Sequence, residues 1–285
     1  MDFAFCVGGI VVEVIGGPLG RPGFSPAGFD AALKPGLPTE RDCLVRVEQV
    51  DHIEAACGEL LFDSGAVWKL FDDGGDYRID CFSEVFGEEP YKSARISRDL
   101  ADVALRMRVR GLDPLQFPLD ELLINALLVE RRGVELHACG IIDRGNGLLF
   151  IGNSGHGKTT TARLWMREEV EVVSDDRVVV RAEHGGWTMY GTPWHGEAEI
   201  CSPASAPLRC VYVLDKAAHN GVTPLGPAEA AAHLFACAFP PFHDPHGLER
   251  FVDTLGELAT SVPVARLAFA NDPSAVAFVR QEEAA

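Results

Sequence analysis

Hydrophobic positions in the first part of the chain recur with the two-residue period of β-strands. Apolar residues alternate with polar or small ones from Val103 to Val109, as in a strand with one buried face. Between residues 44 and 80, short β-type segments are separated by turn sequences, whereas residues 18–40 are rich in proline and glycine and are predicted to be irregular. Residues 1–112 are therefore predicted to form a β-rich domain with an antiparallel sheet and no recognisable chemistry.

After a boundary near residues 111–114, helical and strand-like patterns alternate. Leucines between Leu119 and Arg132 have the spacing of an amphipathic helix, which Gly133 ends. The other predicted elements are hairpins at 134–143 with 147–151 and 177–181 with 187–190, strands at 208–214 and 262–269, and helices at 228–238, 247–259 and 273–281. We therefore predict an α+β protein whose second domain, residues 113–285, is of the α/β type.

The clearest chemical motif is a glycine-rich loop that follows the apolar run at residues 147–151. It reads Gly152-Asn153-Ser154-Gly155-His156-Gly157-Lys158-Thr159 and fits the pattern G-x-x-x-x-G-K-[ST] at every fixed position. Glycines let the backbone turn its N–H groups inward, and the helix predicted from Thr160 to Glu168 adds its positive end. Residues 152–160 are therefore expected to bind the phosphates of ATP. A glycine-rich turn without a ligand is the alternative interpretation.

Side chains in and after this loop favour phosphoryl transfer. Lys158 is expected to reach the β- and γ-phosphates, and the Thr159 hydroxyl to complete the shell of a Mg²⁺ ion. A strand predicted at residues 170–173, and expected beside the loop strand, ends at the acidic pair Asp175 and Asp176. One carboxylate could hold Mg²⁺ while the other accepts the proton of an attacking hydroxyl. An acidic turn that ends the strand is the alternative.

Composition argues against some classes of partner. The formal net charge of −17 argues against a surface that binds nucleic acid or anionic lipid, so neither is an expected partner. The eight cysteines include no C-x-x-C pair, which favours reduced thiols in the cytoplasm over a zinc or redox site. We see no secretory signal and no stretch of membrane-spanning length, and we expect a cytoplasmic protein.

Three motifs in order resemble the HPr kinase family: Leu136-His137-Ala138, the glycine-rich loop, and Ser174-Asp175-Asp176-Arg177. The resemblance covers roughly residues 118–280. It implies an HPr kinase-like P-loop domain, related to that of ATP-dependent phosphoenolpyruvate carboxykinase, that uses ATP and Mg²⁺. It also implies that Asp176 is the catalytic base, that Asp175 lies on the metal side, and that His137 orients Asp176. Without the family, a histidine on an apolar strand is more simply a core residue, and Arg177 either pairs with an acid or faces solvent.

The chain departs from that family in two places. Its bifunctional members carry a metal-holding Glu followed by Arg-Gly-Leu-Gly after the second hairpin, and residues 187–196 hold no acid there. Nor do we find the basic C-terminal motif used in dephosphorylation, so phosphorylase activity is not expected. The run Gly191-Thr192-Pro193-Trp194-His195-Gly196 instead resembles HPr kinase-related proteins of biosynthetic gene clusters, some of which phosphorylate a serine of a peptide precursor. Trp194 and His195 then either line the acceptor pocket or form a structured turn.

Three functions follow from these patterns. The first is an ATP- and Mg²⁺-dependent kinase whose acceptor is a hydroxyl, with serine expected, on a peptide, protein or small molecule. The second is a regulator that binds ATP and transfers nothing, consistent with the missing Glu. The third, a carboxykinase-like decarboxylating enzyme, is the weakest because we find no second cluster of metal ligands and carboxylate-binding arginines. The sequence leaves a homo-oligomer open.

Overall fold

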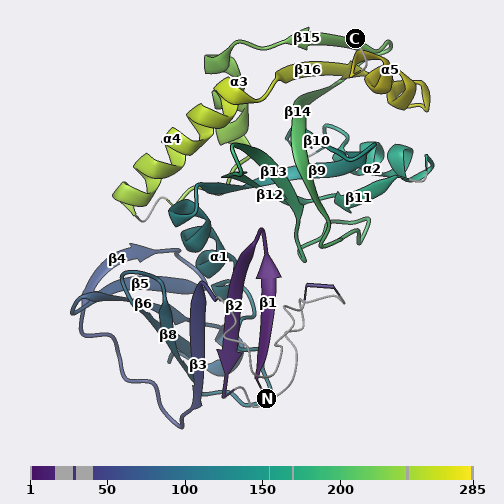
Figure 1. The fold of residues 1–285 in the computed structure, drawn as a ribbon. Helices are drawn as coiled ribbons and strands as arrows, with labels where there is room; N and C mark the ends of the chain where they lie inside the picture. Colours follow the sequence, from purple (N-terminus) through teal and green to yellow (C-terminus); the bar gives the residue numbers. More distant parts are fainter. Residues whose placement is uncertain are drawn as a thin grey trace. The chain divides into compact units, whose positions relative to one another are not determined.

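The computed structural model of the protein describes residues 2–16, 28–29, 41–153, 155–168, 170–241 and 244–283. The chain divides into two compact units, Met1–Leu127 and Leu128–Ala285. Within the described ranges the fold is mixed α+β, with two multi-stranded sheets and five α-helices (Figure 1). The division falls within the first helix, α1 (Leu119–Glu130). Whether residues 1–112 fold as a domain of their own stays a prediction.

The first unit is built on an eight-stranded sheet with the order β1-β2-β3-β8-β7-β6-β5-β4. Its strands are β1 (Phe3–Val7), β2 (Ile10–Ile15), β3 (Cys43–Gln49), β4 (Glu59–Asp63), β5 (Trp68–Asp73), β6 (Asp76–Cys81), β7 (Lys92–Ile96) and β8 (Asp102–Met107), with a short 3₁₀ helix at Glu84–Phe86. The predicted alternation in β8 is confirmed, since Val103, Leu105 and Met107 are fully buried.

The prediction that this sheet is antiparallel is wrong at two of its pairs. Strands β2 and β3 run parallel, and so do β3 and β8. Parallel neighbours need a long crossover, and here the chain leaves β3, forms β4 to β7, and returns alongside β3 as β8. Local alternation cannot reveal such a return. The irregular segment predicted at residues 18–40 lies outside the described residues except at residues 28 and 29.

The second unit is built on a sheet with the order β10-β9-β12-β13-β14-β16-β15, and β11 pairs with β9 off this path. Its elements are β9 (Gly133–Asp143), β10 (Asn146–Ile151), α2 (Lys158–Met166), β11 (Glu171–Ser174), β12 (Arg177–Glu183), β13 (Gly186–Gly191), β14 (Ser205–Lys216), β15 (Gly221–Pro224), α3 (Pro227–Ala236), α4 (Pro245–Ser261), β16 (Val264–Phe269) and α5 (Ser274–Glu282). Both predicted hairpins are confirmed, as β9 with β10 and β12 with β13. The short strand β15 was not predicted.

Strand β9 organises this sheet, because different parts of its length pair with different neighbours. Its second half pairs with β10 along one edge and with β11 along the other, and its first half pairs with β12. The expectation that the strand before the acidic pair lies beside the loop strand is therefore wrong. Both edges of β10 are already occupied, by β9 and by the parallel strand β14, so β11 lies one strand away.

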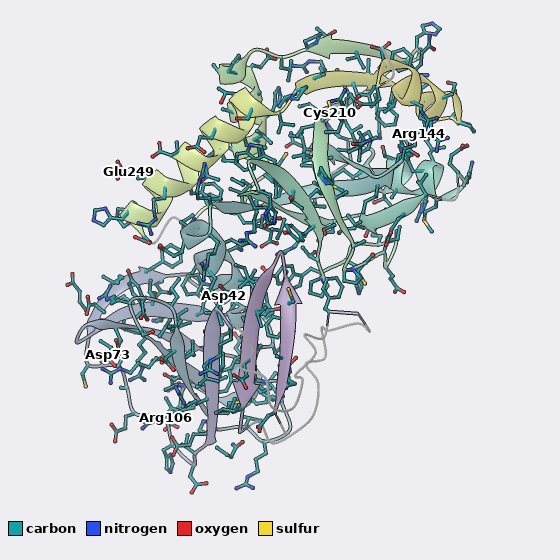
Figure 2. All side chains as sticks on the ribbon, viewed as in Figure 1. Asp42, Asp73, Arg106, Arg144, Cys210 and Glu249 are labelled. Carbon is teal, nitrogen blue, oxygen red and sulfur yellow. The ribbon has the colours of Figure 1, made fainter. Side chains whose placement is uncertain are left out.

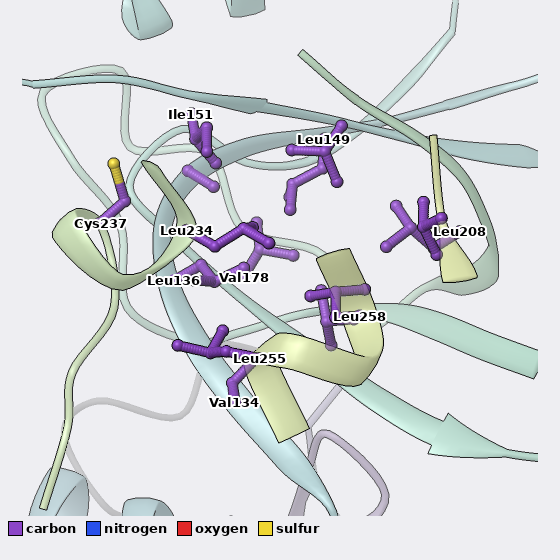
Figure 3. Close-up of a cluster of buried hydrophobic side chains, with 14 of the residues drawn as sticks. Val134, Leu136, Leu149, Ile151, Val178, Leu208, Leu234, Cys237, Leu255 and Leu258 are labelled. Carbon is purple, nitrogen blue, oxygen red and sulfur yellow. The ribbon is translucent and has the colours of Figure 1, made fainter. Parts of the chain in front are cut away.

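Helices and strands of the second unit enclose two hydrophobic clusters. In the first, Leu234 of α3 and Leu258 of α4 pack with Leu136 and Val178 of the sheet (Figure 3). The second gathers side chains of α2 and α5, such as Trp165 and Val276, with strand residues such as Phe150. Burying each large apolar side chain contributes roughly 1.5–3 kcal/mol. Glu249, on the outer side of α4, points away from the sheet (Figure 2). Among the described helices, none has the length and apolar character needed to cross a membrane.

Candidate active site

The glycine-rich loop connects the end of β10 to the start of α2. Gly155 and Gly157 have φ angles of 81° and 109°, a region that side chains rarely adopt. At Gly157 a side chain would also clash, since a Cβ atom there would lie 2.6 Å from Cζ of Phe269. Glycine is therefore required at this position by both backbone conformation and space. Ser154, a predicted phosphate contact, lies outside the described residues.

Lys158 is the first residue of α2, and its side chain is almost completely buried, with 7% exposed. Its Nζ donates hydrogen bonds to the carbonyl oxygens of Gly152 at 2.7 Å and Asn153 at 3.4 Å. Burial lowers the pKa of this ammonium group, and the nearby negative charge of Asp176 opposes that shift. The cation is thus held against the loop backbone and is electrostatically coupled to Asp176.

The other predicted loop residues differ in their surroundings. Thr159 and Thr160 are half-buried in the first turn of α2. His156 is exposed, and its Nδ1 lies 3.2 Å from the carbonyl oxygen of Leu214, so the Nδ1–H tautomer can donate to the end of β14. This contact attaches the loop to the neighbouring strand. His156 stands at a position of the motif where any residue type is allowed, so this contact is not a requirement of the motif.

His137 and Asp176, predicted from separate motifs, lie in contact. Nδ1 of His137 is 3.1 Å from Oδ1 of Asp176 and 3.1 Å from the carbonyl oxygen of the same residue. The hydrogen bond from His137 is the largest influence on Asp176 and holds the pKa of its carboxyl below the usual value. The two residues are adjacent because β12 begins beside β9, where the backbone N–H of Ala138 donates to the carbonyl oxygen of Asp176.

Arg177 does not simply face solvent. Its Nε lies 3.4 Å from Oδ2 of Asp176, and its Nη1 donates to Oε1 of Glu135 at 3.2 Å. The guanidinium carbon stands 4.6 Å from the centre of the Phe239 ring and 6.0 Å from that of Trp194. Arg177 therefore joins two carboxylates while its planar face lies over aromatic rings.

A pocket of about 410 Å³ opens where these groups meet. It is lined by His137, Gly152, Asn153, Asp176, Arg177, Ala236, Cys237, Ala238 and Phe239. The segment after α3 reaches the pocket by pairing with the edge of β9. The backbone N–H of His137 donates to the carbonyl oxygen of Cys237, and the backbone N–H of Phe239 donates to the carbonyl oxygen of Glu135. The structure thus brings the loop, the histidine and one member of the acidic pair to one cavity.

The other member of the acidic pair has a different environment. Asp175 is 3% exposed, and its Oδ1 and Oδ2 accept hydrogen bonds from the backbone N–H groups of Gly196 at 3.0 Å and Ala198 at 2.9 Å. Asp175 therefore fixes the segment that follows Trp194. Among the described residues, neither Trp194 nor His195 lines the pocket, and His195 is exposed.

Two parts of the site were not predicted from the sequence. Glu135 carries a usable signal, because it lies two residues before His137 and so points to the same face of the strand. The segment from Ala236 to Phe239 carries none, since its apolar residues are typical of a helix end. No group of three or more His, Cys, Asp or Glu side chains is arranged to hold a metal ion within the described ranges.

Comparisons with known proteins found similarities over part of the chain. A protein-family model described as "SynChlorMet cassette protein ScmC" matches residues 121–240, which is less than half of the chain. No curated protein matches. Among solved structures, the Hpr(Ser) kinase/phosphatase from Coxiella burnetii is similar to this chain at 13% identity and a TM-score of 0.31, over 53% of this chain and 99% of that chain.

Proposed function

We propose that this protein is a kinase that transfers the γ-phosphoryl group of ATP, with Mg²⁺, to a hydroxyl group. Serine is the expected acceptor, on a peptide, protein or small molecule. One observation carries the proposal: the glycine-rich loop and the His137–Asp176 pair line the same pocket. A loop built for phosphates and a carboxylate placed to accept a proton are the two parts that phosphoryl transfer to a hydroxyl requires.

The residues present fit a nucleoside triphosphate. The loop has left-handed glycines, an α-helix of nine residues behind it, and a buried lysine at its base. Successive backbone N–H groups and the helix N-terminus favour anions, and Lys158 adds a full positive charge. Nucleotide phosphates are therefore the ligand that the loop is proposed to bind.

Thr159 and Asp175 are the residues proposed to hold Mg²⁺. Magnesium in phosphate sites usually has one or two protein carboxylates, with phosphates and water as its remaining ligands, so a larger cluster is not required. When bound, the ion would neutralise charge on the phosphate oxygens. In this proposal Asp176 accepts the proton of the acceptor hydroxyl, and His137 holds that carboxylate in position.

A second candidate is a nucleotide-binding regulator that transfers no phosphate. It is favoured by the engagement of both Asp175 oxygens with backbone N–H groups, which compete with a metal for that carboxylate. The two candidates agree on nucleotide binding and differ on chemistry. We expect neither to release phosphate from a phosphorylated product.

The test is incubation of the protein with γ-labelled ATP and Mg²⁺ in a cell extract, followed by mass spectrometry of every species that gains phosphate. Lys158→Ala is the matched negative control, since it removes the cation and leaves the loop glycines in place. Label on a hydroxyl acceptor with the wild type and not with the variant supports the kinase. Nucleotide binding without any transfer supports the regulator.

A further inference from the structure

Alternating residues of β9 and β12 separate the core from a charged face. Leu136 of β9 and Val178 of β12 belong to the first hydrophobic cluster. Glu135 and His137 point to the opposite face of β9, and Arg177 stands directly across from His137 in the register of the two strands. Three charged or polar side chains are thus placed side by side by strand geometry.

Glu135 is the deepest of these groups, with 0% of its side chain exposed. A carboxylate so buried is costly unless it is paired and hydrogen-bonded, and Arg177 supplies a guanidinium at 3.2 Å. The same guanidinium reaches Asp176 at 3.4 Å, and Asp176 contacts His137 at 3.1 Å. These contacts form a continuous series of charged and polar side chains from the buried Glu135 to the wall of the pocket.

The position of Arg177 is therefore determined from two sides. Glu135 holds Nη1, and Phe239 lies against the guanidinium plane. Because two carboxylates share the cation, neither draws it fully to itself. Removing the charge of Glu135 would leave Asp176 as the other carboxylate in this ion pair. Arg177 would then move toward Asp176 and draw that carboxylate away from His137.

We propose that Glu135 is a positioning residue for phosphoryl transfer: through Arg177 it sets where the Asp176 carboxylate stands in the pocket. This inference rests on the proposed kinase function. Glu135 does not line the pocket, so it acts on the chemistry through another side chain and leaves the nucleotide contacts of the loop intact.

The principal test is Glu135→Gln, which keeps the size of the side chain and removes its charge. We expect kcat to fall by roughly ten- to a hundredfold, on the scale of a misplacement of about 1 Å in a reacting group. KM for ATP and the Kd of a non-hydrolysable ATP analogue should be unchanged. In an Arg177→Gln background the same substitution should lower kcat no further, because the connecting cation is already absent.

A matched control lies at the other end of the same strand. Asp143 is 9% exposed, and its two oxygens accept hydrogen bonds from Arg280, each at 3.0 Å, far along β9 from the pocket. Asp143→Asn should destabilise the protein in a comparable way and keep kcat. Should Glu135→Gln not fold, Glu135→Asp keeps the charge but withdraws it from Arg177, and it should lower kcat with unchanged nucleotide affinity.

The outcomes separate the two levels of the proposal. Transfer by the wild type with an unchanged kcat in folded Glu135→Gln or Glu135→Asp would overturn the positioning role alone. Equal losses of kcat in Glu135→Gln and Asp143→Asn would also overturn it, since a general loss of stability would then be sufficient. Absence of transfer by the wild type would overturn the kinase function and the positioning role with it.

Discussion

Two buried lysines, one in each unit, allow a direct comparison. Lys92 begins β7 of the first unit with 0% of its side chain exposed, and Lys158 begins α2 of the second with 7% exposed. Each donates to two backbone carbonyl oxygens: Lys92 to Pro114 and Gln116, Lys158 to the loop itself. Burial is the main influence on both and lowers the pKa of both.

The surroundings of the two lysines distinguish them. The carbonyl oxygens around Lys92 belong to a segment more than twenty residues along the chain, so this lysine joins a strand to a distant loop. Lys158 follows two glycines in left-handed conformations, contacts Gly152 in the pocket wall, and is electrostatically coupled to Asp176. Burial of a lysine is thus not in itself a sign of function; the loop and the pocket beside it are.

The largest effect is expected from substitution of Lys158. Lys158→Ala should abolish phosphoryl transfer and weaken nucleotide binding, because the phosphates lose their fixed cation. Lys92→Ala, the matched variant, should cost stability and leave transfer unchanged in the folded protein. Calorimetry with a non-hydrolysable ATP analogue, beside a transfer assay, measures both. Equal nucleotide affinity and turnover in wild type and Lys158→Ala would remove the site assignment.

The next effect concerns the carboxylate coupled to Lys158. Asp176→Asn keeps shape and hydrogen-bonding capacity but cannot accept a proton, so transfer should fall by roughly 10²- to 10⁴-fold. ATP and Mg²⁺ should still bind nearly as well as in the wild type. Rapid-quench measurement of a single turnover reports the chemical step. Full kinase activity in this variant would show that another group is the base.

A smaller effect is expected at the neighbouring carboxylate. The backbone N–H groups of Gly196 and Ala198 each donate to one oxygen of Asp175. In Asp175→Asn one of these oxygens becomes an amide nitrogen, so one N–H group loses its acceptor, and the free energy of unfolding should fall by about 1–3 kcal/mol. Urea unfolding measures this loss. If Asp175 also holds Mg²⁺, a titration should show a raised Mg²⁺ requirement. An unchanged midpoint and slope of unfolding would show that the segment after Trp194 does not depend on these bonds.

The smallest effect uses the pH dependence of Lys92. Its pKa in the folded protein is below the ordinary 10.5, so between the two values the unfolded chain retains a proton that the folded chain has released. The contribution of Lys92 to stability therefore rises as pH increases toward 10.5. Lys92→Met should lack this rise. The unfolding free energy of the wild type minus that of the variant should therefore become more positive as pH increases in that window. Lys158 titrates in both proteins and cancels. Parallel pH profiles would contradict the assignment.

Local patterns of the sequence determined a large part of the second unit. The alternation around Leu136, the turn between β9 and β10, and the glycine pattern of the loop are all readable within short windows, because hydrogen bonding within a hairpin or helix depends on near neighbours. The contact between His137 and Asp176 followed from the family resemblance, and the structure places the two side chains 3.1 Å apart.

Tertiary structure alone decided which of these elements meet. The parallel pairing of β3 with β8, the separation of β11 from β10, and the segment after α3 that closes the pocket all join residues far apart in the chain. The difference between Asp175, bound to backbone N–H groups, and Asp176, facing the pocket, has the same origin. Adjacent carboxylates look alike in a sequence. Their environments differ because strand register and burial direct one toward a segment of backbone and the other toward a cavity.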